Sequence, residues 1–178
     1  MISTRSCIVL LALAFGVCHA CLSSRPPDST GPVSEGQIAP NFRFKDQSGK
    51  ELSLVDLRGK VVLINFWATW CPPCREELPS LVSLLQQTDP NELKILALSV
   101  DESWAPVNEY LRQVGMLVPV YDDFDRNISK RYGTLKFPET YIVDRKGTVV
   151  RKVIGATDWV APSMIAYLKE LLTESNSG

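Results

Sequence analysis

Histidine and excess charge are what this sequence most lacks. His19 is its only histidine, and its 19 basic residues are offset by 20 acidic ones, for a net charge of −1. Without a basic excess, the chain has no strong electrostatic attraction to nucleic acid or anionic lipid. Its composition, with 45% apolar and 22% charged residues, is that of an ordinary globular domain. These features argue against nucleic acid as a partner and leave the class of function open.

A long hydrophobic run is also missing. Residues 7–17 form an unbroken apolar stretch of 11 residues, whereas a helix needs about 20 to cross a bilayer. Arg5 is the only charge in the first 20 residues, and the small residue Ala20 follows the stretch. This pattern is typical of a cleavable export signal over residues 1–20. A buried core helix is the alternative.

Cleavage after Ala20 would make Cys21 the first residue of the exported protein. This arrangement resembles the lipobox of bacterial lipoproteins, in which that cysteine receives the lipid, although Cys18 stands where such signals usually carry leucine. Two outcomes are therefore open: a periplasmic protein anchored to the membrane through Cys21, or a protein released in soluble form. Residues 21–37, rich in Ser, Pro and Gly, predict a flexible tether, and residues 38–178 predict one domain.

Hydrophobic periodicity predicts an alternation of strands and helices in this domain. Phe42, Phe44, Leu52 and Leu54 alternate with polar residues and predict a β-hairpin. Strands are predicted over residues 60–67, 93–100, 118–121, 139–144 and 148–154, and helices from Cys71, from Ser103 to 114, from Asp125 to Gly133 and from Thr157 or Asp158 to 173. This order implies an α/β protein with a mixed central sheet flanked by helices. With its N-terminal hairpin, it resembles the thioredoxin fold.

Cys71 and Cys74 are the residues with the clearest chemistry. Of the five cysteines, Cys7 and Cys18 fall in the predicted export signal and Cys21 follows it. The remaining pair lies between a strand and a helix, which is the setting of a redox Cys-x-x-Cys motif. The helix dipole favours the thiolate of the first cysteine. We therefore predict Cys71 as the attacking nucleophile and Cys74 as the resolving thiol.

Two other roles for the pair are less well supported. A disulfide staple between residues three apart closes too small a loop to add much stability. A zinc site needs four ligands, and the sequence offers neither a second Cys pair nor a histidine beyond the signal. We therefore expect no metal and no cofactor. A copper or zinc carrier on the same fold is the non-enzymatic alternative.

Proline and tryptophan residues surround the pair. Pro72 and Pro73 suit the first helical turn, where backbone N–H groups have no helical partner, while Pro79 either kinks the helix or is tolerated near its start. Trp67 is expected in the core, and Trp70 either covers the two sulfurs or contacts partner proteins. We expect Trp70, Pro72 and Pro73 on the substrate-binding surface.

The segments that resemble a known family extend from residue 38 to the last helix. They are Ala39-Pro40-Asn41-Phe42, Leu57-Arg58-Gly59-Lys60, residues 65–74, Glu77 and Phe137-Pro138-Glu139-Thr140. In these segments the sequence resembles the extracytoplasmic thioredoxin-like reductases of the ResA, TlpA and cytochrome c biogenesis type. The resemblance implies a thiol-disulfide oxidoreductase that reduces disulfides of exported proteins, including apocytochrome c, and is re-reduced by a membrane electron donor.

The resemblance also implies roles for residues outside the cysteine pair. In thioredoxin-like proteins a cis-proline loop faces the cysteines, so we expect a cis Phe137–Pro138 bond, with Phe137 pairing to an extended substrate segment. Asn65 occupies the position at which cytosolic thioredoxins carry a buried aspartate that assists proton transfer. Because an amide takes up no proton at neutral pH, Glu77, three residues after Cys74, is a candidate proton acceptor. A solvated carboxylate that stabilises the helix start is the alternative.

A thiol peroxidase of the peroxiredoxin type is the enzymatic alternative. The segment from Ala39 to Trp67 is also similar to the lead-in of those enzymes. They place a threonine further from the reactive cysteine than Thr69 lies from Cys71. Peroxide consumption with sulfenic acid at Cys71 would favour a peroxidase, and reduction of insulin disulfides would favour the oxidoreductase.

Overall fold

A five-stranded mixed sheet lies at the centre of the molecule in the computed structural model, which describes residues 32–115 and 117–173. The strand order is β5-β4-β3-β6-β7. The strands are β3 (Val61–Trp67), β4 (Leu93–Ser99), β5 (Val120–Asp122), β6 (Glu139–Val143) and β7 (Val149–Ile154). β3, β4 and β5 are parallel, whereas β6 is antiparallel to β3 and β7 is antiparallel to β6. This mixed sheet confirms the prediction of a thioredoxin fold.

β3 is the middle strand of the sheet, and both of its faces are covered. All seven of its residues are buried, and its sequence, Val-Val-Leu-Ile-Asn-Phe-Trp, is apolar except for Asn65. β4 is buried in the same way apart from Lys94, which is partly exposed. Continuous apolar runs, rather than alternating ones, are typical of strands that are covered on two sides. For the same reason, the predicted bounds of these two strands agree with the structure to within one residue.

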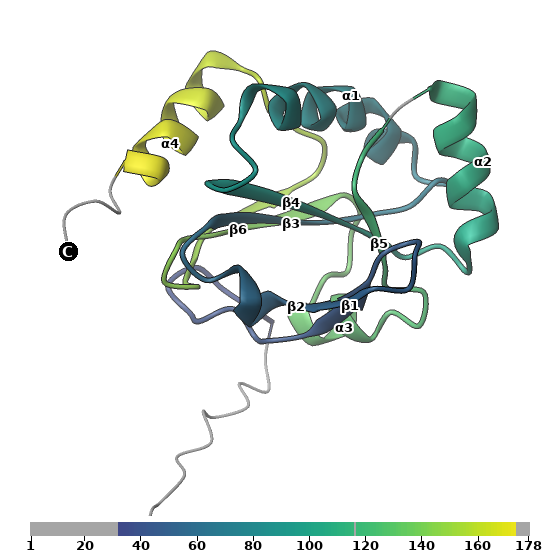
Figure 1. The fold of residues 1–178 in the computed structure, drawn as a ribbon, viewed down its shortest axis with the longest axis horizontal. Coiled ribbons are helices and arrows are strands. Elements are labelled where there is room, and N and C mark those ends of the chain that lie inside the picture. The colour runs from purple at the N-terminus through teal and green to yellow at the C-terminus, as the bar shows by residue number, and fades with distance from the viewer. Residues whose placement is uncertain (1–31, 116, 174–178) are drawn as a thin grey trace, which may run out of the picture.

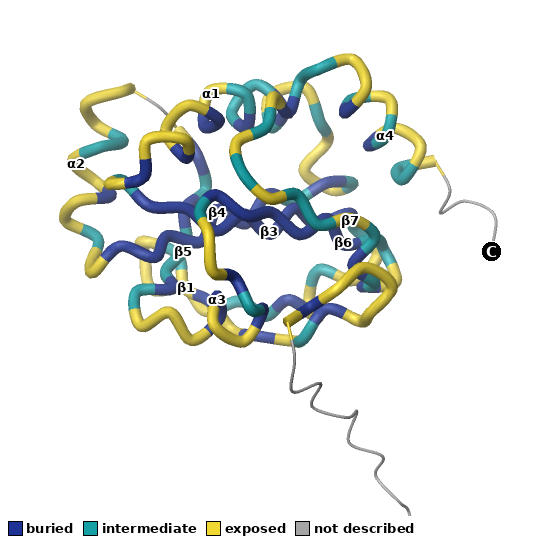
Figure 2. Tube along the Cα trace, turned by 180° about the vertical axis from the view of Figure 1, so that it is seen from behind, coloured by how far each residue is buried: buried dark blue, intermediate teal, exposed yellow. Residues whose placement is uncertain are grey.

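Helices cover both sides of the sheet. In Figure 1, α1 (Pro72–Gln87), α2 (Trp104–Val114) and α4 (Pro162–Thr173) lie on one side, and α3 (Asn127–Tyr132) lies on the other with β1 (Arg43–Lys45) and β2 (Glu51–Ser53). The two short strands pair antiparallel, which confirms the predicted hairpin, and they lead into a 3-10 helix at Leu54–Leu57. Burial follows this layering: β3, β4 and β6 are almost entirely buried, the edge strands β5 and β7 are largely half-buried or exposed, and the outward parts of the helices are exposed (Figure 2).

The start of α3 differs from the prediction that Asp125 caps it. The carboxylate of Asp123 accepts hydrogen bonds from the backbone N–H groups of Ile128 and Ser129, each at 2.8 Å. Asp125 accepts only from the first residue of the helix. Arg126 adopts a left-handed conformation, with a φ of 57°. This turn brings Asp123 to the N-terminus of α3, so the main cap comes from a residue earlier in the sequence than Asp125.

The start of α4 was also predicted wrongly. The helix begins at Pro162 and not at Thr157 or Asp158. Asp158 accepts a hydrogen bond of 3.1 Å from the N–H of Val160 and so stabilises a turn before the helix. Thr157 donates its N–H to Glu77 at 3.2 Å. Proline suits the first position of a helix because its missing N–H would have no helical partner there.

The domain begins earlier than residue 38. Val33 is 1% exposed, and its N–H donates to the carbonyl oxygen of Tyr132 at 3.0 Å. Residues 33–37, which we expected in the tether, are therefore part of the domain, because the apolar Val33 fills a place in its core. The predicted export signal, Cys21 and the rest of the tether lie outside the described residues. Among the residues described, no helix has the length and hydrophobicity needed to span a membrane.

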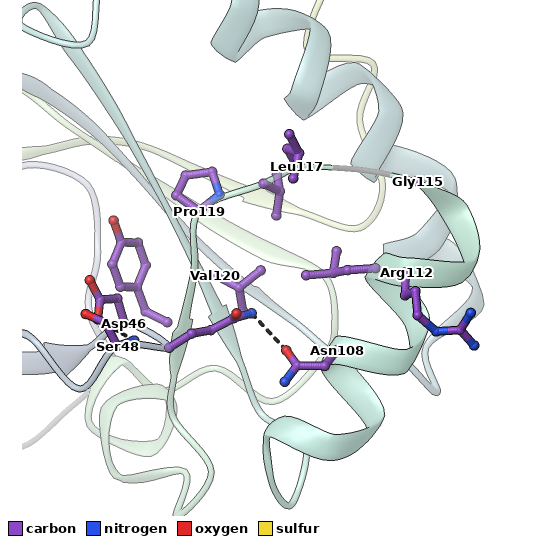
Figure 3. Close-up of a pocket in the computed structure, with 12 residues that line it drawn as sticks. Asp46, Ser48, Asn108, Arg112, Gly115, Leu117, Pro119 and Val120 are labelled. Atoms are coloured by element: carbon purple, nitrogen blue, oxygen red, sulfur yellow. Dashed lines mark hydrogen bonds between the residues drawn. The ribbon is translucent and has the colours of Figure 1, made fainter.

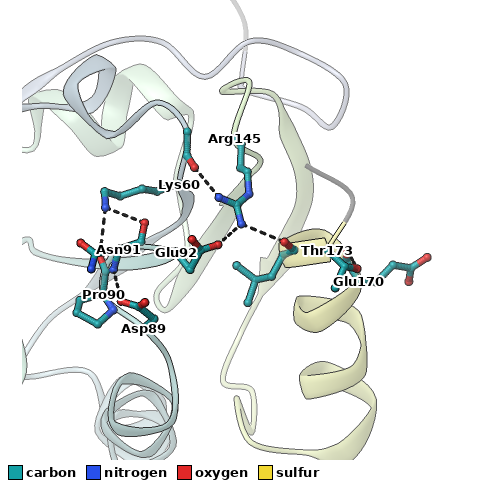
Figure 4. A network of polar contacts seen from close by, with 10 residues as sticks. Lys60, Asp89, Pro90, Asn91, Glu92, Arg145, Glu170 and Thr173 are labelled. Atoms are coloured by element: carbon teal, nitrogen blue, oxygen red, sulfur yellow. Dashed lines mark hydrogen bonds and ion pairs between the residues drawn. The ribbon is translucent and has the colours of Figure 1, made fainter. Parts of the chain in front are cut away.

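Arg145 connects several segments at the end of the sheet where β3 and β4 begin. Its guanidinium donates to the carbonyl oxygens of Gly59 at 2.8 Å and Leu172 at 3.0 Å and pairs with Glu92. These partners lie just before β3, in α4 and just before β4 (Figure 4). The opposite end of β3 leads into the cysteine pair, so this network stabilises the scaffold from the far end of the strand.

Candidate redox site

Cys71 and Cys74 form a disulfide at the start of α1. Cys71 is the N-cap of the helix, and its Sγ accepts a hydrogen bond of 3.3 Å from the N–H of Cys74. Cys71 is 4% exposed and Cys74 is 0% exposed. Pro72 and Pro73, both exposed, occupy the first helical turn. The sulfur of Cys71 is thus the more accessible one, and it lies where the helix dipole stabilises a thiolate.

α1 continues through Pro79 without a break and ends at Gln87. Of the neighbouring tryptophans, Trp67 is fully buried in β3, as expected. Because Trp67 ends β3 and Cys71 caps α1, the loop between the strand and the helix consists of residues 68–70. The redox pair therefore lies at the junction of two packed elements.

Asp101, a residue that the sequence analysis missed, holds the loop before Cys71. It is 2% exposed, and its carboxylate accepts hydrogen bonds from the N–H of Thr69 at 3.0 Å and from Thr69 Oγ1 at 2.6 Å. Ser99 Oγ donates to the same carboxylate at 2.7 Å. Because β3 and β4 are parallel neighbours, the residues that follow them meet at one edge of the sheet. That adjacency is the sequence signal by which Asp101 could have been found.

Glu77 lies on the buried side of α1, three residues beyond Cys74. It is 2% exposed, and its carboxylate accepts from Asn65 Nδ2 at 2.7 Å, from the N–H of Thr157 at 3.2 Å and from Trp159 Nε1 at 3.3 Å. Burial raises the pKa of Glu77 above its ordinary value, and the three donors offset part of this rise. The alternative of a solvated carboxylate is therefore wrong, because packing against β3 and the segment before α4 encloses the side chain.

Asn65 connects Glu77 to β6. Its amide nitrogen also donates to Thr140 Oγ1 at 2.9 Å, while its Oδ1 is buried with no hydrogen-bond partner among the described residues. An asparagine amide offers donors on one side and an acceptor on the other. In the present orientation the amide donates to the carboxylate of Glu77. A half-turn of the amide would present Oδ1 as an acceptor to a protonated Glu77, so Asn65 can form a hydrogen bond with either protonation state of this carboxyl group.

An aromatic surface lies beside the cysteine pair. The Phe137–Pro138 bond is cis, which confirms that prediction. Trp70 is 55% exposed, and its ring meets the ring of Phe137 edge-on, with 6.0 Å between the centroids. Because Trp70 is largely open to solvent, its position favours contact with partner proteins over coverage of the sulfurs.

A cavity of about 730 Å³ lies away from these residues. It is formed between α2, β5 and the turn of the hairpin, and it includes Asp46, Asn108 and Leu117 (Figure 3). Neither cysteine, Glu77 nor Pro138 lines it, so it is not part of the redox site. No cluster of three or more His, Cys, Asp or Glu side chains in residues 32–115 and 117–173 could hold a metal ion.

Known proteins are similar to this chain in both sequence and fold. Residues 36–152 match the AhpC/TSA family. The thiol-disulfide oxidoreductase ResA of Bacillus subtilis is 33% identical over 148 residues, which cover 83% of this chain and 80% of the relative. A solved structure of a candidate thiol:disulfide interchange protein DsbE from Chlorobium tepidum is 25% identical, with a TM-score of 0.71 over 79% of this chain and 99% of that one.

A candidate protein disulfide isomerase from Bacteroides thetaiotaomicron is similar to the same extent. It is 26% identical, with a TM-score of 0.72 over 81% of this chain and 93% of that one. The two structures and the ResA relative share thiol-disulfide chemistry in their names, and the cysteine pair described above has the geometry that this chemistry requires. The chain therefore belongs to the AhpC/TSA family, within which it is a thioredoxin-like thiol-disulfide oxidoreductase.

Proposed function

We propose that the protein is a periplasmic reductase that breaks disulfides in exported proteins, apocytochrome c among them. The observation that carries this proposal is the Cys71–Cys74 pair, whose first sulfur is the more accessible and lies at a helix N-terminus. Disulfides persist outside the cytosol, so an export signal at residues 1–20 would bring the pair to the compartment where such substrates occur. The names of the relatives support the reaction and specify no substrate.

The reaction consists of two thiol-disulfide exchanges. The Cys71 thiolate attacks one sulfur of the client disulfide, forms a mixed disulfide and expels the other client sulfur as a thiolate, which takes up a proton. Cys74 then loses its proton and attacks the Cys71 sulfur, which closes the Cys71–Cys74 disulfide and releases the second client thiolate. Two electrons pass from the protein to the client. A membrane-bound dithiol donor then reduces the pair for the next cycle.

Glu77 is the proposed acceptor of the Cys74 proton. Residues three apart share one face of a helix, and both side chains are buried. A carboxyl group whose pKa is raised by burial holds a proton more readily than an exposed one. Glu77→Gln should therefore change the pH dependence of client reduction. An unaltered pH profile in this variant would exclude the role.

The client is proposed to bind as an extended segment against the backbone of Phe137, beside Pro138. The side chains of Trp70, Pro72 and Pro73 would flank it, because all three are exposed next to the cysteines. Trp70→Ala is expected to raise KM for insulin more than it lowers kcat, since the ring acts in binding and not in the exchange itself. A variant that lowers kcat alone would contradict this placement.

Replacement of Cys74 by Ser tests which proteins are the substrates. Without the resolving thiol, the mixed disulfide between Cys71 and the client accumulates and can be isolated from the host and identified. The Cys71→Ser, Cys74→Ser double variant is the control, and it should trap nothing. Exported proteins in the trap would support the proposal, whereas a trap that holds only a membrane electron donor would contradict it.

A thiol peroxidase is the second candidate, and the match of residues 36–152 to the AhpC/TSA family favours it. The disulfide between residues three apart favours dithiol exchange instead. Rapid consumption of hydrogen peroxide with sulfenic acid at Cys71 would support the peroxidase, and reduction of insulin with slow peroxide consumption would support the reductase.

Membrane anchoring through Cys21 is proposed from the sequence around the predicted cleavage site. An acylated cysteine that carries several chains would hold the protein firmly at the membrane. Cys21→Ser should then move the protein from the membrane fraction to the soluble envelope fraction. An unchanged distribution would show that Cys21 is not the anchor.

A further inference from the structure

Arg126 has an unusual backbone conformation close to the redox site. With a φ of 57°, it is the one residue other than glycine with a positive φ in residues 32–115 and 117–173. In this left-handed region the Cβ atom crowds the backbone, so glycine or asparagine is normally found there. An arginine held in this conformation points to a role for its side chain.

The guanidinium of Arg126 lies over the ring of Trp70, with 5.8 Å from its central carbon to the ring centroid. The same ring meets Phe137 edge-on. Arg126 is exposed, and its guanidinium has no hydrogen bond or ion pair within the described part of the chain. Its acidic neighbour Asp125 already binds Asn127 through both carboxylate oxygens. The N–H donors of Arg126 are therefore available to a ligand.

We propose that Arg126 binds a carboxylate of the client, on an Asp or Glu side chain close to the disulfide that is reduced. A guanidinium that lies over an aromatic ring is restrained by the cation–π attraction, and its fork of N–H groups matches a carboxylate. Trp70 directly precedes Cys71, and Phe137 directly precedes Pro138. A client whose sulfur reaches Cys71 therefore comes within range of this stack. The inference rests on the proposed function, and it adds that the preferred client carries a negative charge near its disulfide.

The residues around the stack fit the same kind of client. Leu135 is 88% exposed, and Lys136 is exposed beside it. Leu135 lies two residues before Phe137 in the chain, so its exposed side chain adds apolar surface near the aromatic pair. Lys136 adds a second cation to the surface. An extended segment with apolar and acidic residues next to its cysteine complements both features.

Two disulfide peptides that differ in one residue beside the cysteine test the proposal. One carries Asp and the other carries Lys at that position. The reduced wild-type protein should reduce the Asp peptide about two- to fivefold faster at low salt, and the preference should shrink as salt is added. Arg126→Gly should reduce the preference to the part that Lys136 contributes, and Arg126→Lys should retain more of it. Glycine is well suited to a positive φ, so the Gly variant should keep the fold.

Arg151→Ala is the matched control. Arg151 of β7 also lies over an aromatic ring, that of Tyr167, at 4.2 Å, and its removal changes the net charge by the same amount. This variant should keep the wild-type preference. Equal rates for the two peptides with wild type, or a preference that is undiminished in Arg126→Gly, would overturn the carboxylate site and leave the reductase intact. Failure to reduce either peptide would overturn both.

Discussion

Asn65 of β3 donates a hydrogen bond of 2.7 Å to Glu77 of α1, and both side chains are buried. This bond joins the strand that leads to Cys71 with the helix that carries Cys74. The pKa of the buried carboxyl group is set by desolvation, which raises it, and by its hydrogen-bond donors, which lower it. The pH dependence of the protein should therefore respond to changes in this small set of contacts.

Glu77 is expected to make the protein less stable as the pH rises. Its pKa is raised in the folded protein, so the folded state holds the proton more tightly than the unfolded state does. This contribution is fully present below the ordinary carboxyl pKa and is lost as the pH rises through the raised pKa. In urea titrations, the free energy of unfolding of wild type minus that of Glu77→Gln should decrease as the pH rises above the ordinary carboxyl pKa of about 4. A difference that stays constant would contradict this assignment.

Trp159→Phe is expected to raise the pKa of Glu77 further. Trp159 Nε1 donates to the carboxylate at 3.3 Å, and this bond lowers the pKa that burial raises. The pH range over which stability is lost should therefore move upward. Trp67→Phe is the matched control, because Trp67 is equally buried and its Nε1 has no hydrogen-bond partner among the described residues. Equal shifts in the two variants, measured by urea titration at several pH values, would exclude the hydrogen bond as the cause.

Asp101→Ala is expected to lower both stability and the rate of disulfide reduction. The change removes the carboxylate to which the part-buried Thr69 donates through its N–H and Oγ1 and the buried Ser99 through its Oγ. The loss of these partners should cost about 2 to 4 kcal/mol of unfolding free energy. Because Thr69 precedes the redox motif, the loop should loosen and the reaction with insulin should slow. Asp158→Ala, which removes one local bond to Val160, is the control and should change both measurements far less.

Gly133→Ala tests the early start of the domain. Gly133 has a φ of +72°, and a Cβ atom there would lie 2.6 Å from the Cα of Pro32. Gly115 has a similar φ of +64°, with no atom within 4 Å of such a Cβ. Gly115→Ala should therefore cost about 1 kcal/mol from backbone strain alone. Gly133→Ala should cost about 1 to 3 kcal/mol more because of the collision, as measured by urea unfolding. Equal losses would show that Pro32 does not pack against Gly133.

Local sequence patterns were sufficient for most of the fold. β3 and β4 were predicted because a strand covered on both faces has a continuous apolar run, and α1 because Leu78, Leu81 and Leu84 recur at helical spacing and are buried in the structure. The starts of α3 and α4 were predicted wrongly because they depend on the turns before the helices and not on a local pattern. Near α3, Asp123 and Asp125 are both suitable caps, and the turn at Arg126 decides between them. Before α4, Thr157 and Asp158 form other contacts, and the helix begins at Pro162.

The redox chemistry could be predicted from the sequence alone, because the two cysteines, their spacing of three and their place between a strand and a helix are local properties. The surroundings of the pair, in contrast, depend on contacts between residues far apart in the sequence. Asp101 reaches Thr69 across 32 residues, Thr157 reaches Glu77 across 80, and Trp159 reaches Glu77 across 82. Contacts over such separations arise only when the parallel strands align and the segment before α4 folds back on α1, so no local pattern contains them.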